Sequence, residues 1–143
     1  MSGVVILRAA LLQIPGVTAL IGQNVWVQTP QDIKCAPGSL DGAYILITRV
    51  TEPTWGKLDS PSKIYETRAQ LQCLAGTEGG ADQMGEALKG LEDIANTIIA
   101  GFYVDQMRKA ETDYSDYSDG RQVYRRVCDY IVVWKNAGGS PSP

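Results

Sequence analysis

The sequence predicts an α+β fold, with a mainly antiparallel sheet of four to five strands and two helices packed on one face of the sheet. Three observations support this prediction. In two separate segments, apolar residues recur at spacings of three and four, as they do in amphipathic helices. Several runs that are rich in β-branched and aromatic residues have the composition of strands. The order helix, three strands, helix, two strands differs from the strict alternation of a parallel α/β sheet.

The first half of the chain is expected to contain one helix and three strands. The helix covers about Val4 to Ile14, and Pro15-Gly16 ends it, with a short helical turn possible before Gly22. The strands cover Val25–Val27, Ala43–Thr51 and Ile64–Leu74. Segment 29–42 is rich in Pro and Gly and is expected to be a loop. Segment 52–63 is too long for a tight turn and is expected to be an extended hairpin tip.

The second half is expected to contain the longer helix and two strands. This helix covers about Ala81 to Ile99, and Gly101 ends it. Its apolar stripe consists of Met84, Leu88, Leu91, Ala95 and Ile98. A strand then covers Phe102–Lys109, and the polar segment Asp113–Gly120 is expected to be a loop before the last strand, Arg121–Trp134.

The last predicted strand is unusual because it is apolar on much of both faces and contains no Gly or Pro. A strand of this kind usually lies inside a sheet or against another subunit. It also carries three charged residues, Arg125, Arg126 and Asp129. Two interpretations of these charges stay open: they are solvated, or they pair across a subunit interface and set its register.

Composition bounds the kind of protein. The chain has 143 residues, which suits one domain over residues 1–135, followed by a Gly/Ser/Pro tail, 136–143, that we expect to be disordered. Its net charge of −3 gives no broad basic surface for nucleic acid or membrane. Cys35, Cys73 and Cys128 are odd in number and far apart, which argues against a disulfide framework. The apolar run Val4–Leu7 is a poor signal peptide, so we expect a soluble intracellular domain.

Motifs for catalysis are weak. The chain has no histidine, no phosphate-binding loop and no dinucleotide fingerprint. Asp113, Asp116 and Asp119 recur every third residue, whereas ligands of a helix–loop–helix calcium site recur every second residue, so an acidic solvated turn is the better interpretation. Cys73 and Cys128 are better explained as buried hydrophobic residues than as nucleophiles. The sequence therefore predicts a protein that is not an enzyme and needs no metal or cofactor.

Two features are candidates for contact with a partner. Trp55 lies on the predicted hairpin tip among polar residues, where it either anchors a partner or folds back onto its own sheet. The three aspartates of the acidic segment, Asp113, Asp116 and Asp119, are further candidates for a protein interface. With Arg125, Arg126 and Asp129, these residues make up the predicted interface set.

The arrangement of the predicted elements resembles a known family over about Val4 to Trp134. Two strand patterns carry the resemblance, TRAQLQCLA at Thr67–Ala75 and VYRRVCDYIVVW at Val123–Trp134. An N-terminal apolar helix, a Val-Trp-Val strand and a helix of about twenty residues accompany them. In this layout the chain is similar to the tail-completion, or tail-terminator, proteins of long-tailed bacteriophages and of related phage-derived particles.

The resemblance implies a structural role in a virion. Such subunits form a ring, usually a hexamer, on the head-proximal end of the finished tail tube, where the ring stops tube growth and joins the tail to the head. The implied partners are further copies of the chain, the tail tube protein and a head–tail connector or head-completion protein, with DNA passing through the lumen without sequence-specific binding. Assembly would take place in the host cytoplasm, and no membrane is involved. The alternatives are a head-completion or connector adaptor at the same junction and a small bacterial enzyme or binding module.

Overall fold

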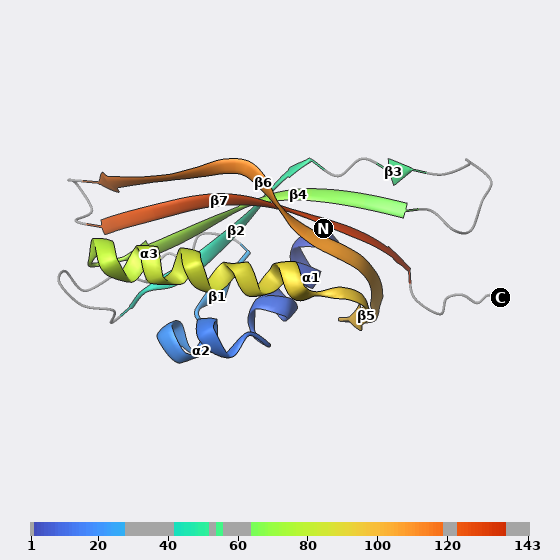
Figure 1. Ribbon diagram of the computed structural model, residues 1–143, viewed down its shortest axis with the longest axis horizontal. Coiled ribbons are helices and arrows are strands. Elements are labelled where there is room, and N and C mark those ends of the chain that lie inside the picture. Colours follow the sequence, from blue (N-terminus) through green and yellow to red (C-terminus); the bar gives the residue numbers. More distant parts are fainter. Residues whose placement is uncertain (1, 28–41, 52–53, 56–63, 119–122, 137–143) are drawn as a thin grey trace.

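The computed structural model describes residues 2–27, 42–51, 54–55, 64–118 and 123–136. Within these ranges the chain is an α+β protein, whose helices lie together on one side of a long, curled sheet (Figure 1). The helices are α1 (Ser2–Leu11), α2 (Pro15–Ile21) and α3 (Glu78–Ala87), and α3 continues as the 3-10 helix η1 (Leu88–Asp93). Three α-helices therefore replace the two that the sequence predicted, because Pro15 opens a separate helix at its first position.

The sheet has seven strands in the described part of the chain, more than the four to five predicted. They are β1 (Val25–Trp26), β2 (Tyr44–Thr51), β3 (Thr54–Trp55), β4 (Ile64–Ala75), β5 (Ala95–Ile99), β6 (Phe102–Ser118) and β7 (Val123–Asn136). Their order is β1-β2-β4-β7-β6-β5, and β3 pairs with the start of β4. Only β1 and β2 run parallel among these pairs, so the sheet is mainly antiparallel as predicted.

The predicted helix Ala81–Ile99 was wrong in its second half. Met84, Leu88 and Leu91 are buried as a helical stripe, but residues 95–99 form strand β5. The reason is the turn that follows: Ala100 and Gly101 both have positive φ, as a two-residue hairpin turn requires, and they pair Ile99 with Phe102. The apolar spacing favours a helix over residues 95–99, but the tight hairpin with β6 makes this segment a strand.

The predicted loop Asp113–Gly120 was also wrong as far as Ser118, because β6 continues through it and pairs with β7. Three residues of β6, Ala110 to Thr112, lie opposite Asp129 alone, and β6 bends at this bulge (Figure 1). Strands β6 and β7 together form a long two-stranded ribbon. At the C-terminal end of β7, Asn136 belongs to the strand rather than to the predicted tail. The remainder of that tail, 137–143, and residues 29–41 of the predicted loop 29–42 lie outside the described residues.

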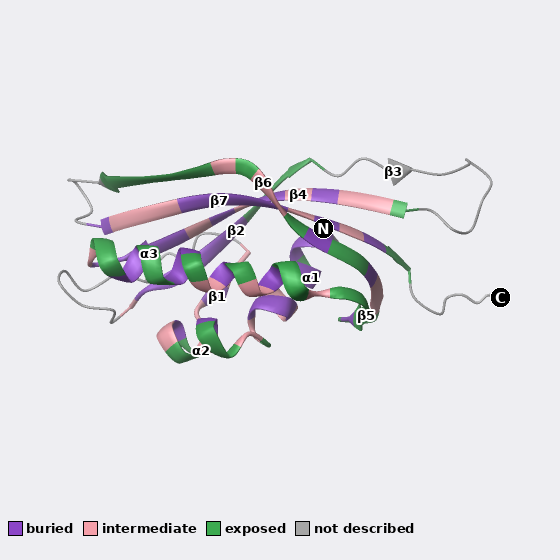
Figure 2. Ribbon diagram, in the orientation of Figure 1, coloured by how far each residue is buried: buried purple, intermediate pink, exposed green. Residues whose placement is uncertain are grey.

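The main hydrophobic core lies between the helices and the sheet, and Figure 2 shows the buried side of each helix turned toward the strands. Cys73 and Cys128 are both buried in this core, as predicted, and both are free thiols. Trp134 stacks on Tyr65 at 4.4 Å between ring centroids and donates from Nε1 to Thr67 Oγ1 at 2.9 Å. On the helix side of the sheet, the apolar side chains of β7 thus pack into the core of their own subunit.

Among the described helices, none is long and apolar enough by itself to cross a membrane. The pair α1 and α2 passes a test of length and composition when taken together, with an 80° bend between the two helices.

Candidate functional site: the charged ribbon of strands β6 and β7

Strand β7 carries charged side chains on both faces of the sheet, and each of them has a partner inside the subunit. Because side chains alternate along a strand, Arg126 points to the helix side, while Arg125 and Asp129 point to the opposite side. The Arg/Asp set of the sequence therefore divides into three separate contacts.

Arg126 joins β7 to β6 and to α3. Its Nε and Nη2 donate to the two carboxylate oxygens of Asp113, each at 3.1 Å, in the bidentate geometry that suits a guanidinium. Its Nη1 donates to Glu86 Oε2 at 3.0 Å and to the backbone oxygen of Asp82 at 3.2 Å. Lys109 also pairs with Asp113. The result is a small network that holds helix α3 against the β6–β7 ribbon.

The network is possible because α3 has a glycine where Arg126 crosses it. A Cβ on Gly85 would lie 2.4 Å from Arg126 Cδ and 2.7 Å from its Nε. These distances are too short for any real side chain, so only the missing Cβ allows the guanidinium to reach Asp113 and Glu86 together. Gly85 is buried under Arg126 for this reason.

The network shifts the pKa values of its members. Hydrogen bonds from Arg126 and then Lys109 hold the pKa of the Asp113 carboxyl well below its ordinary range. The same hydrogen bond with Asp113 raises the pKa of Arg126 above that of a free guanidinium. Burial, followed by the charge of Asp113, raises the pKa of the neighbouring Cys128 thiol to about 11. This cysteine is therefore a poor nucleophile near neutral pH.

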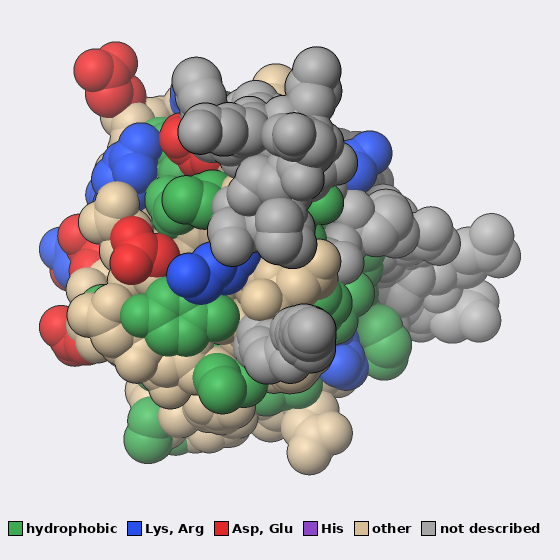
Figure 3. All heavy atoms as spheres, turned by 90° about the vertical axis from the view of Figure 1, so that its right-hand side faces the viewer, with side chains coloured by type: hydrophobic (Ala, Val, Ile, Leu, Met, Phe, Trp, Pro, Cys, Tyr) green, Lys and Arg blue, Asp and Glu red, His purple; other side chains and the backbone are tan. Residues whose placement is uncertain are grey.

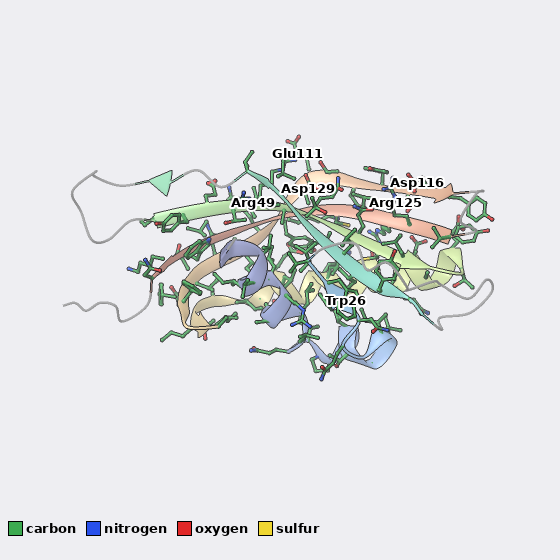
Figure 4. The ribbon with its side chains drawn as sticks, turned by 180° about the vertical axis from the view of Figure 1, so that it is seen from behind. Trp26, Arg49, Glu111, Asp116, Arg125 and Asp129 are labelled. Carbon is green, nitrogen blue, oxygen red and sulfur yellow. The ribbon has the colours of Figure 1, made fainter. Side chains whose placement is uncertain are left out.

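Arg125 makes the second contact on the opposite face of the sheet. It lies directly across from Asp116, with Nε to Oδ1 at 3.0 Å and Nη2 to Oδ2 at 2.6 Å, and Figure 4 labels both residues. Its Nη1 donates to Gln72 Oε1 at 3.0 Å. Its guanidinium also lies 5.9 Å from the ring centroid of Tyr114. Hydrogen bonding to Arg125 lowers the pKa of Asp116 below the ordinary aspartate value.

Asp129 makes the third contact and is the most buried of the three, with 5% of its surface exposed. Arg68 on β4 donates from Nε to its Oδ2 at 3.0 Å, and the Arg68 Nη2 also reaches Thr112 Oγ1 at 3.2 Å. The other carboxylate oxygen, Oδ1, is buried and has no hydrogen-bond partner among the described residues. The β6 bulge lies opposite this residue, so one arginine bridges β4, β7 and the bulge.

These contacts bring the two strand patterns of the sequence together. Pattern Thr67–Ala75 forms most of β4, pattern Val123–Trp134 forms most of β7, and the two strands pair in antiparallel register at the centre of the sheet. Arg68 and Gln72 of the first pattern contact Asp129 and Arg125 of the second pattern. The residues that carry the resemblance thus stabilise one another.

The structure places the predicted interface residues in different ways. Five of them form ion pairs within the subunit: Arg125 with Asp116, Arg126 with Asp113, and Asp129 with Arg68. These charges are therefore not simply solvated. Their role at an interface stays a prediction. Trp55 lies in β3, opposite Ile64, and its side chain is outside the described part, as is Asp119.

Sequence reasoning missed several residues that take part in the three contacts, namely Arg68, Gln72, Gly85, Glu86 and Lys109. A signal existed for Arg68 and Gln72, which belong to a quoted pattern. The others lie on segments whose pairing cannot be read locally, since Glu86 and Arg126 are forty residues apart.

The charged side chains of Arg125, Arg126 and Asp129 in this ribbon are engaged in ion pairs within the subunit. Among the described residues, no group of three or more Cys, Asp and Glu side chains could hold a metal ion. On the end of the molecule seen in Figure 3, the visible acidic, basic and hydrophobic side chains are interspersed rather than gathered by kind. Carboxylates held by arginines, as Asp113 and Asp116 are, are poor general acids or bases at neutral pH.

A search of solved structures found a similar chain in the "Virion of native gene transfer agent (GTA) particle". The two chains are 14% identical, the match covers 93% of this chain and 97% of that chain, and the TM-score is 0.60. At this identity the similarity concerns the fold alone. No curated protein sequence matched. The family model described as "Tail completion protein gp17" matches residues 5–135. Because this match spans nearly the whole chain, the protein belongs to the tail completion protein gp17 family.

Proposed function

We propose that this protein is a structural virion subunit that forms a hexameric ring on the head-proximal end of a phage tail tube. The ring ends tube polymerisation and provides the surface for head–tail joining. The observation that carries this proposal is the family match over residues 5–135, since the family is one of tail completion proteins. The similar chain in a gene transfer agent virion supports the same assignment, because that chain is part of an assembled particle.

The physical features of the subunit suit assembly. A closed ring needs heterologous contacts, in which one patch meets a different patch of the neighbour. The described helices cover one face of the sheet and leave the other face without a helix (Figure 1). Several large apolar side chains are exposed on the described surface, and these are Val5, Val50, Ile64, Ile98, Tyr114 and Tyr117. Such a subunit has more than one surface to offer to neighbours.

The proposed partners are other copies of the chain, the tail tube protein and a connector or head-completion protein. DNA passes through the lumen without sequence-specific binding, which suits the net charge of −3. The virion is the final location, and assembly takes place in the host cytoplasm. Trp55, Arg125, Arg126 and Asp129 remain candidate contact residues in this proposal.

The proposal that Asp113, Asp116 and Asp119 face the lumen or a neighbouring ring needs a refined test. Neutralising Asp113 removes the main partner of Arg126, so that change would also weaken the fold. Asp116→Asn with Asp119→Asn spares this network. Asp116→Asn loses the partly exposed ion pair with Arg125, which contributes little, so the double variant should still fold and should change head–tail joining. Unchanged joining would reject the lumen assignment.

The decisive experiment removes the protein from particle assembly. Loss of a terminator should give overlong or headless tails, and electron microscopy measures the tail lengths directly. Tails of normal length that fail to join heads would instead favour a head-completion or connector adaptor. Native mass measurement of the purified protein, alone and with tail tubes, tests the ring and its hexameric stoichiometry. A strict monomer under all these conditions, together with normal particles in its absence, would favour a binding module or enzyme.

A further inference from the structure

We propose that a cavity beside the end of β6 and the start of β7 binds an arginine side chain of an adjoining virion subunit. This inference rests on the proposed function insofar as the occupant is taken to be a virion subunit. The cavity has a volume of about 170 Å³ and lies between the start of α3 and the ribbon. Among the described residues, its lining includes Glu78, Ala81, Asp82, Ser115, Asp116, Tyr117, Tyr124 and Arg125.

Two tyrosine rings provide an aromatic surface in the cavity. Tyr117 and Tyr124 lie directly across from each other on β6 and β7, with ring centroids 4.5 Å apart and planes tilted by 45°. Tyr117 is 45% exposed, so its ring is accessible to a visiting group. Aromatic faces attract cations, and a planar guanidinium stacks on them better than an ammonium does.

The charge of the lining is negative and is not balanced internally. Among the lining residues, α3 contributes two carboxylates, Glu78 and Asp82, whereas the side chains of Asp116 and Arg125 pair with each other on the opposite face of the sheet, which leaves two net negative charges. Arg125 is already held by Asp116 in a bidentate pair. Glu78 and Asp82 are both exposed, and within the described residues neither carboxylate has an ion-pair partner. These two groups are therefore available to a cation from outside.

The partial positive charge at the start of α3 opposes the binding of a cation only weakly. A helix N-terminus carries a partial charge of about half a unit, which is smaller than the net charge of the lining. Thr77 Oγ1 already accepts from the Gly80 backbone N–H at 2.9 Å, and this cap occupies one of the free donors. An anionic occupant would meet both carboxylates at close range, so the lining selects a cation.

Arginine fits better than lysine for geometric reasons. A guanidinium can lie flat against a tyrosine ring and still present two parallel N–H groups to a carboxylate, whereas an ammonium is a point charge. Tyrosine and arginine are also the residue types that most often dominate protein interfaces. The cavity is thus suited to anchor one arginine of a neighbouring subunit.

The test uses L-arginine amide as the probe and follows the backbone and tyrosine resonances of the full chain by NMR. We expect saturable shifts at Glu78, Asp82, Tyr117 and Tyr124, with weaker binding of L-lysine amide. The double variant Glu78→Gln/Asp82→Asn should bind at least about threefold more weakly, since it removes both unpaired carboxylates. The matched control, Glu92→Gln/Asp93→Asn on η1, changes the net charge equally and should bind as the wild type does.

Failure of this inference is distinct from failure of the proposed function. Absence of saturable shifts, or equal affinity in the Glu78/Asp82 variant, would overturn the cavity assignment even if rings form. If rings form normally from that double variant at moderate salt, the arginine-anchor role is also overturned. Saturable binding by a chain that never forms a ring would support the cavity while rejecting the ring.

Discussion

Replacing Gly85 by alanine should destabilise the protein, although Gly→Ala usually stabilises a helix, because Arg126 occupies the space that the new methyl group needs. In an ordinary helix interior, Gly→Ala stabilises by about 0.5–1 kcal/mol. Here the Cβ would lie 2.4 Å from Arg126 Cδ, 2.7 Å from Nε and 2.9 Å from Nη1. Since these atoms belong to a flexible side chain, the guanidinium would move and α3 would stay in place.

The magnitude follows from the contacts that Arg126 would lose. Its two bonds to Asp113 are charge-assisted, and hydrogen bonds to charged groups contribute about 1.5–3 kcal/mol. Only 13% of the Arg126 side chain and 28% of the Asp113 side chain are exposed, so solvent screening reduces the value moderately, to about 2 kcal/mol for the pair. After the helical gain, Gly85→Ala should destabilise the fold by about 1 kcal/mol, or roughly 2–4 °C in Tm for a chain of this size.

A thermodynamic cycle isolates this effect. In an Arg126→Ala background the space is empty, and Gly85→Ala should then stabilise by about 0.5–1 kcal/mol. The control is Gly79→Ala, also in α3, where a Cβ would meet nothing within 4 Å. Urea denaturation of the four proteins of the cycle and the control measures each free energy. If Gly85→Ala stabilises the wild type as much as it stabilises the Arg126→Ala variant, the reasoning is refuted.

Two further outcomes follow from the same structure. Thr67→Val removes the acceptor of the buried Trp134 N–H and should cost about 1–3 kcal/mol in urea denaturation, whereas Thr97→Val on the exposed strand β5 should be nearly neutral. Because the pKa values of Asp113 and Asp116 are lowered in the folded state, their contribution to stability is complete above the ordinary aspartate pKa of about 4 and is lost as the pH falls below it. The free energy of unfolding, measured from pH 7 to pH 2.5, should drop less in Asp113→Asn than in the wild type, and parallel curves would contradict this.

The sequence predicted β1, β2, β4 and β7 well, because their composition and the turn residues that flank them are local signals, whereas β3 lies in the segment expected to be a hairpin tip. The segment Ala81–Ile99 was predicted less well. Its apolar spacing matches a helix throughout, yet the hairpin turn at Ala100-Gly101 makes residues 95–99 a strand. Segment Asp113–Ser118 looks like a loop by composition, but its aspartates are neutralised by arginines of β7, so it is stable as a strand.

The sequence alone determined the family membership and the absence of histidine, since both depend only on residue order and identity. The α+β class followed from periodicity. What only the tertiary structure decided was the use of the charged residues: Arg125, Arg126 and Asp129 meet Asp116, Asp113 and Arg68 inside the subunit. The partners of a charge are set by which strands and helices come side by side, and that depends on contacts between residues far apart in the chain. Local patterns place a side chain on a strand, but they do not say what faces it.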